Sequence, residues 1–161
     1  MDHDHLQIVA EVGVAIVGFS GIVALFATNL RLKSGGINQL RFVDLLLSGF
    51  GAVFLSFTPG LFGYVGLTEV SIWRWSEVVM TCWFLGTLVV LFSIGRTNKP
   101  EAKWHFVFPV VAVILTLTLI ASISGLVTFS PGALHFVGLL WLLGISSIEF
   151  SLLLLKAIYD T

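Results

Sequence analysis

The chain has 161 residues, of which 57% are hydrophobic and only 11% are charged, and its net charge is −1. A soluble domain carries about 25% charged residues, so this composition and a mean hydropathy of +1.04 favour a protein whose solvent is lipid. Without a basic excess there is no support for nucleic-acid binding. The single cysteine, Cys82, excludes an intramolecular disulfide and a CxxC motif.

Apolar runs long enough to cross a bilayer, which takes about 20 helical residues, occur five times. They cover roughly 6–30, 42–65, 70–94, 104–127 and 132–157. Backbone groups in lipid must be hydrogen-bonded within the protein, so we expect α-helices. The first run is too long for a signal peptide and follows acidic residues, so we expect a retained helix. The prediction is one all-α transmembrane domain, residues 1–161, folded as a compact bundle of five helices.

Basic residues gather at one side of this predicted topology. They lie in or beside the loops after the first and third runs and near the end of the fifth: Arg31, Lys33, Arg41, Arg96, Lys99, Lys103 and Lys156. The positive-inside rule then places the N-terminus outside and the C-terminus inside. Tyr64, Trp73 and Trp75 would form an aromatic belt at the outer interface. We therefore expect a multi-pass protein of the inner or plasma membrane.

The deepest charged residue in the predicted spans is Glu149, in the stretch SSIEFS of the fifth run. It lies about seven residues, or roughly 10 Å, from the inner end of that run. Ser146, Ser147 and Ser151 are close to it on the helix and would form a polar strip. Two interpretations remain open. Glu149 could clamp two helices together by hydrogen bonds, or it could bind a proton or cation in a pathway through the membrane.

A second acidic residue, Glu11, lies in the outer half of the first run, followed by Gly13, Gly18 and Gly21. Small residues allow two helices to approach closely, so these glycines predict a helix-packing surface. Glu11 shares a face with Gly18 and is expected to point at a neighbouring helix. It could also line the mouth of a pathway.

Two further acid–base pairs lie three residues apart on predicted helices. Arg74 and Glu77 would form an ion pair near the outer boundary, or Glu77 could face inward with Arg74 as its counter-ion. Asp44 and Arg41 would pair at the inner start of the second run, where Asp44 also suits a helix N-terminus. Pro59-Gly60 predicts a kink, a helix that stops at Thr58, or a broken helix that lines a polar pathway.

Motifs of known enzymes are missing: the chain has no HExxH, GxSxG, Walker loop or GxGxxG. His3 and His5, in the sequence DHDH, are weak candidates for Zn²⁺ or Cu²⁺ ligands at a terminus that is expected to fray. We expect a protein that is not an enzyme and has no cofactor.

Two functions fit these features. The first is a homo-oligomeric protein with an ion- or proton-conducting pathway, in which Glu149, Glu11 and Glu77 are the binding groups. The second is a structural or accessory subunit of a larger membrane complex, which binds other membrane proteins through small-residue helix faces. The direction in which Glu149 faces discriminates between them. A position on a symmetry axis favours a pore, and a contact with a helix of its own chain favours a clamp.

Overall fold

The computed structural model describes residues 3–29, 37–97, 107–130 and 132–159. These residues form helices and no strands: α1 (His3–Asn29), α2 (Ile37–Tyr64), α3 (Glu69–Thr97), α4 (Val107–Ile123) and α5 (Ala133–Tyr159). The predicted all-α class is confirmed. Several of the basic residues that suggested the orientation, among them Arg31, Lys33, Lys99 and Lys103, lie outside the described residues, and the orientation stays a prediction.

Four of these helices are long and apolar enough to cross a membrane, in the stretches His5–Ile22, Leu40–Tyr64, Glu69–Ile94 and Ala133–Leu155. In α4 the apolar stretch is shorter and covers Pro109–Ile123. The described part of α4 is 17 residues long, or about 26 Å, which is slightly less than a hydrocarbon core of about 30 Å. The chain is therefore a multi-pass membrane protein by the length and composition of its helices.

Helix ends at both short loops are set by glycine. Gly125 has a φ of 79°, a left-handed conformation that residues with a Cβ rarely adopt. Its N–H bonds to the Ser122 carbonyl, and the N–H of Leu126 bonds to the Ala121 carbonyl. This is a Schellman motif, and it ends α4 four residues before the predicted boundary at 127. Gly66, with a φ of 81°, ends α2 in the same way.

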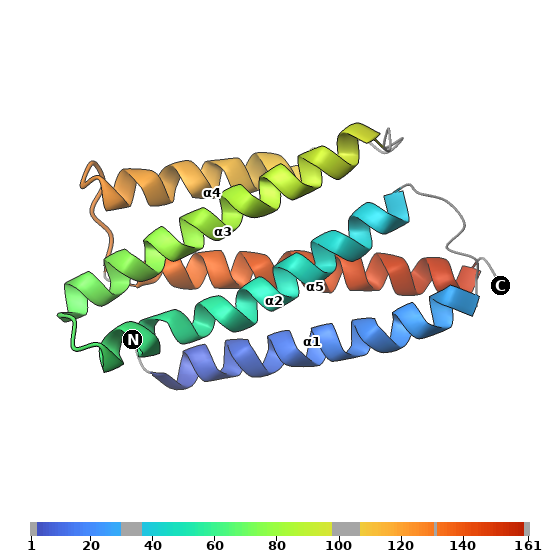
Figure 1. Ribbon diagram of the computed structural model, residues 1–161, viewed down its shortest axis with the longest axis horizontal. Coiled ribbons are helices and arrows are strands. Elements are labelled where there is room, and N and C mark those ends of the chain that lie inside the picture. The colour runs from blue at the N-terminus through green and yellow to red at the C-terminus, as the bar shows by residue number, and fades with distance from the viewer. Residues whose placement is uncertain (1–2, 30–36, 98–106, 131, 160–161) are drawn as a thin grey trace.

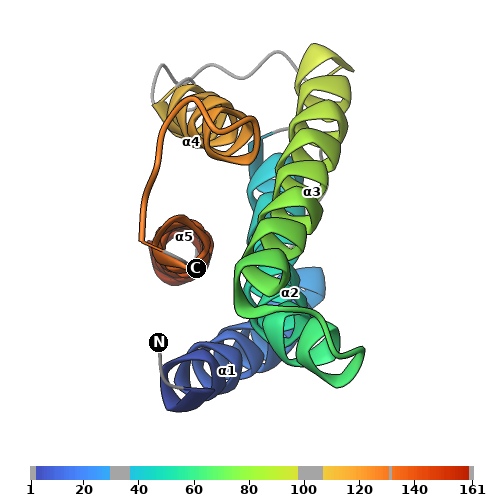
Figure 2. The same cartoon turned by 90° about the vertical axis from the view of Figure 1, so that its left-hand side faces the viewer.

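Neighbouring helices in the chain run in opposite directions (Figure 1). We call the end of the bundle where α1, α3 and α5 begin the proximal end, and the opposite end the distal end. Viewed along the bundle, α2 lies in the middle, in contact with α1, α3 and α5, and α4 packs mainly on α3 (Figure 2).

The apolar core is formed mainly by α3 and α5, with contributions from α1 and α2, and includes Leu55, Met80, Phe84, Leu139 and Leu142. Large apolar side chains also cover much of the outside, such as Phe54 at 58% exposure and Phe92 at 73%. Such a surface is suited to lipid. Trp73 belongs to the core and is only 8% exposed, so its predicted place in a lipid-facing aromatic belt is wrong.

Candidate functional site: polar groups buried between helices

Glu149 faces α2 of its own chain. Its side chain is 1% exposed, and its Oε2 atom lies 3.6 Å from Nε of Arg41, which is 19% exposed. Helix α5 carries Glu149 and the first two turns of α2 carry Arg41, so the ion pair connects the two helices near the distal end. Neither of these two atoms has a hydrogen-bond partner among the described residues. The pair is therefore a loose electrostatic contact and not a bidentate bridge.

A second carboxylate, Asp44, lies one turn after Arg41 on α2 and is 8% exposed. It accepts a hydrogen bond of 3.3 Å from the hydroxyl of Ser48, and it interacts electrostatically with Glu149. Ser146 is fully buried and donates to the Leu45 carbonyl of α2 at 3.3 Å. We call Arg41, Asp44, Ser48, Ser146 and Glu149 the distal cluster. It contains two acids and one base.

The other serines near Glu149 do not belong to this cluster. Ser147 and Ser151 are exposed and donate to carbonyls of their own helix, Leu143 and Ser147, at 2.8 Å each. Each is two positions from Glu149 along the chain, and on a helix such neighbours do not share a face. The predicted polar strip thus has only Ser146 on the buried face with Glu149.

The two predicted pairs along single helices are replaced by contacts between helices. Arg41 pairs with Glu149 and not with Asp44. On α3, Arg74 is exposed, whereas Glu77 is 7% exposed and accepts a hydrogen bond of 3.1 Å from Ser122 of α4. Arg74 acts on Glu77 only as a nearby charge. Glu77 therefore faces inward, as the second interpretation of this pair required.

Near the proximal end, α2 continues through Pro59 and ends at Tyr64, so a helix that stops or breaks at Pro59 is wrong. Proline has no N–H and leaves the carbonyl four residues earlier without its helical partner. That carbonyl belongs to Leu55. It accepts hydrogen bonds from His135 Nε2 of α5 at 3.0 Å and from the Thr58 hydroxyl at 2.8 Å. The neighbouring helix thus replaces the missing bond, which is how membrane helices accommodate proline.

His135 is fully buried and its ring lies 6.1 Å from the ring of Trp73. A carbonyl can only accept, so the bond to Leu55 places the proton of a neutral His135 on Nε2. Its Nδ1 atom is buried and has no hydrogen-bond partner in the described part of the chain.

The predicted packing glycines of α1 divide into two groups. A Cβ built at Gly13 would lie 2.8 Å from Val53 Cγ2, so α1 and α2 are in close contact there. A Cβ at Gly18 or Gly21 would meet nothing within 4 Å. These two glycines are exposed and face away from the bundle.

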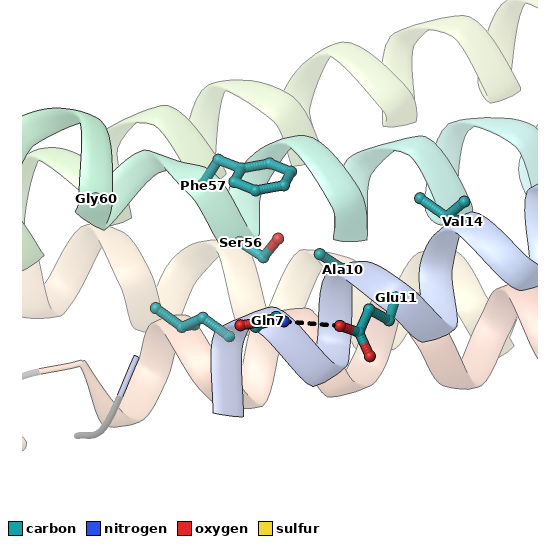
Figure 3. Close-up of a pocket in the computed structure, with 8 residues that line it drawn as sticks. Gln7, Ala10, Glu11, Val14, Ser56, Phe57 and Gly60 are labelled. Carbon is teal, nitrogen blue, oxygen red and sulfur yellow. Dashed lines mark hydrogen bonds between the residues drawn. The ribbon is translucent and has the colours of Figure 1, made fainter. Parts of the chain in front are cut away.

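Glu11 is also exposed on α1, and it accepts a hydrogen bond of 2.9 Å from Gln7. It lies at the edge of an open groove of about 610 Å³ between α1 and α2. Figure 3 shows Gln7 and Glu11 on one wall of this groove, with Ser56, Phe57 and Gly60 on the other. Glu11 thus faces away from the buried polar groups of the bundle.

The histidines proposed as weak metal ligands are not brought to a common site. His5 is exposed, and its ring lies 6.4 Å from that of Phe136. The side chain of His3 lies outside the described residues. Within the described residues, no group of three or more His, Cys, Asp or Glu side chains could hold a metal ion.

Several contact residues were missed by sequence reasoning. His135 and Ser122 were not assigned roles, although a proline inside an apolar run signals that a nearby donor is needed. Gly49 was missed as well. A Cβ there would lie 2.6 Å from Val17 Cγ2 and 3.1 Å from Ser146 Oγ, so α2 is in tight contact with both α1 and α5. Its signal was the sequence SGFGA, which is rich in small residues.

Comparison of the chain with protein-family models, with curated proteins and with solved structures found no match.

Proposed function

We propose that this protein is a structural or accessory subunit of a larger membrane protein complex and not an enzyme. The observation that carries the proposal is the direction of Glu149, which is buried against Arg41 of its own chain. A carboxylate that lines a pore has to face water or a symmetry axis. A carboxylate that holds two helices of one subunit together acts as a clamp.

The other buried polar groups support the same function. Glu77 contacts Ser122, and His135 contacts the Leu55 carbonyl, so each joins two helices of the chain. Between His135 and the distal cluster the large core side chains are apolar: Met80, Phe84, Leu139 and Leu142 are each at most 2% exposed. The buried hydroxyls of Thr81 and Thr116 donate to carbonyls of their own helices. Such a layer holds a bundle together, and these two hydroxyls are already bonded.

The test is affinity purification of the full chain from its native membrane in a mild detergent. We expect an unrelated membrane protein to co-purify in a fixed stoichiometric ratio. Glu149→Gln should reduce the stability of the chain without producing a transport defect. A preparation that contains only copies of this chain, under several detergents and after cross-linking in the membrane, would contradict the proposal.

A second candidate function is a homo-oligomer with an ion- or proton-conducting pathway. It is favoured by the composition of the distal cluster, where Glu149 interacts with both the Arg41 guanidinium and the Asp44 carboxylate. One proton shared by the two acids would make the cluster neutral, so the cluster offers a proton-binding position inside the membrane. The test is proton flux in liposomes that contain only this protein. Flux that disappears in Glu149→Gln supports this function, and the absence of flux at every voltage and pH tested rejects it.

A further inference from the structure

The groove between α1 and α2 opens to the outside of the bundle and has an ionisable residue on its rim. Its walls include Gln7, Glu11 and Val14 of α1 and Ser56, Phe57 and Gly60 of α2 (Figure 3). Glu11 lies inside the stretch of α1 that is apolar and long enough to span the membrane. It is eight residues from the first residue of α1, or about 12 Å along the helix axis.

A charged side chain at this depth is costly when it faces lipid, and such residues almost always have a partner. Within the described residues, Glu11 has a single hydrogen bond, from the amide of Gln7. An amide supplies no positive charge. The carboxylate therefore lacks the cationic partner that Arg41 provides for Glu149.

The same side of α1 is shaped for close contact with a helix. Going toward the distal end from Glu11, the residues at helical spacing are Val14, Gly18 and Gly21. The two glycines have open space where a Cβ would be. On the α2 side, Phe57 lines the groove and is 56% exposed, and Leu61, four residues further along the helix, is 60% exposed. A strip of small residues beside a ridge of large ones fits a helix.

We propose that this groove binds one transmembrane helix of a partner protein, and that the helix carries a Lys or Arg side chain about 12 Å from the proximal end. The inference rests on the proposed function, because it names the surface and the chemistry through which the accessory subunit binds. The basic side chain pairs with Glu11, and the partner's backbone packs against Gly18 and Gly21.

The charge of Glu11 selects this occupant over the alternatives. A lipid acyl chain fills an apolar groove but offers nothing to a carboxylate. A second copy of the chain would have to supply an exposed base at the same depth. Ile72 packs near Gly63, so Arg74, two residues further along α3, is level with about residue 61 of α2. Glu11 shares the groove with Ser56, which lies roughly 8 Å deeper than residue 61. Arg74 of a second copy is therefore not at the depth of Glu11.

The experiment measures binding of designed helices to the purified full chain in liposomes. The probes are peptides of Leu and Ala, about 23 residues long, labelled for energy transfer to a fluorophore on the protein. One has a single Lys at the depth of Glu11, one has Leu at that position, and one has the Lys near the distal end. We expect the first to bind about tenfold more tightly than the other two.

Two variants test the assignment. Glu11→Gln should remove the preference for the Lys peptide and leave binding of the Leu peptide unchanged. Gly18→Leu should weaken binding of both peptides because it fills the contact strip. Glu69→Gln is the matched control, since Glu69 is an exposed acid at the start of α3 and is not among the residues that line the groove. The preference should survive in it.

Three results would overturn the proposal. One is equal binding of the Lys and Leu peptides, and another is a preference that persists in Glu11→Gln. The third is efficient disulfide formation between two copies of Gly18→Cys in a Cys82→Ser background at high lipid dilution, which would identify a second copy as the occupant. Co-purification tests the accessory function separately. If the preference for the Lys peptide depends on Glu11 but no other protein co-purifies, the groove proposal holds and the accessory function is rejected. If a partner co-purifies equally well with Glu11→Gln, the accessory function holds and the groove proposal is rejected.

Discussion

Glu149 and Glu11 are two carboxylates within apolar helices, and they differ in their exposure and in their partners. Glu149 is 1% exposed and lies 3.6 Å from an arginine of the neighbouring helix. Glu11 is exposed and is bonded only to Gln7 on its own helix among the described residues. One acid lies where α2 and α5 meet. The other lies on the face of α1 that points away from the bundle.

The contrast teaches that burial and pairing are not evenly distributed over this bundle. Where two helices meet, Glu149, Glu77 and His135 each have a partner across the contact, because an unpaired charge or polar group in a dry interior is costly. On the outer face of α1 the same kind of group has no such partner within the described part of the chain. The first arrangement stabilises the chain itself, and we infer that the second serves association with another protein.

The largest expected effect comes from Arg41→Met. It removes the one base of the distal cluster and leaves Asp44 and Glu149 close together in a desolvated site. Removing one partner of a buried pair typically costs about 3–5 kcal/mol. We expect Arg41→Met to lower the unfolding free energy by an amount that approaches this range. The measurement is unfolding in a denaturing detergent, followed by circular dichroism. Glu149→Gln should cost less, because the charge left without its partner is then Arg41, which is 19% exposed and so keeps some solvent.

Arg96→Met is the control for this experiment. Arg96 is exposed in the last turn of α3, and surface substitutions change stability by about 0.5 kcal/mol or less. If Arg41→Met unfolds like the Arg96 variant, the distal cluster contributes nothing to the bundle and the contrast with Glu11 is lost.

A smaller loss of stability is expected for Gly49→Ala, which we compare with Gly18→Ala. Gly49→Ala places a methyl group 2.6 Å from Val17 Cγ2, and valine cannot easily rotate away on a helix. Overpacking of this kind costs about 1–3 kcal/mol. Gly18→Ala meets nothing within 4 Å and should keep or slightly raise stability, because alanine favours a helix over glycine. Thermal denaturation of the two variants in the same detergent measures the difference. Equal losses would show that Gly18 also lies in a contact.

The sequence predicted the helices because each apolar run in a membrane must satisfy its own backbone. The run boundaries agree with the helix ends within about five residues, and the largest differences are the start of α2 and the end of α4, where Gly125 ends the helix early. The depth of Glu149 was likewise predictable from its position in the run. Its partner was not, because Arg41 is 108 residues earlier in the chain and nothing local connects the two.

The intervals between residues in the sequence could not predict which neighbouring helix each side chain faces. A three-residue interval made Arg41 and Asp44 look like a pair, but a buried acid on α5 attracted the guanidinium instead. Likewise Gly13, Gly18 and Gly21 form one series in sequence, and only Gly13 lies against α2. Periodicity shows which residues share a face, whereas the neighbour on that face depends on the packing of all the helices.

The next prediction concerns the neutral contact at Pro59, which joins helices without any charge. His135→Phe keeps the ring against Trp73 but removes the donor to the Leu55 carbonyl. That carbonyl keeps the Thr58 hydroxyl, so the loss should be near the low end of the range for a buried polar group, about 1 kcal/mol. Pro59→Ala restores the helical N–H and should recover most of this loss in the double variant. Chemical denaturation of the four proteins gives the coupling energy. A coupling energy of zero would show that His135 does not replace the missing helical bond.

The smallest effect is expected for Glu11→Gln. The new amide can still accept a hydrogen bond from Gln7, and Glu11 makes no ion pair within the described residues. The unfolding midpoint of the purified chain in detergent should therefore match that of the parent, measured side by side with Glu149→Gln. A clear loss of stability would mean that the carboxylate already has an essential partner inside its own chain. Glu11 and Glu149 would then have the same role, and the groove would have no unpaired carboxylate with which a second protein could interact.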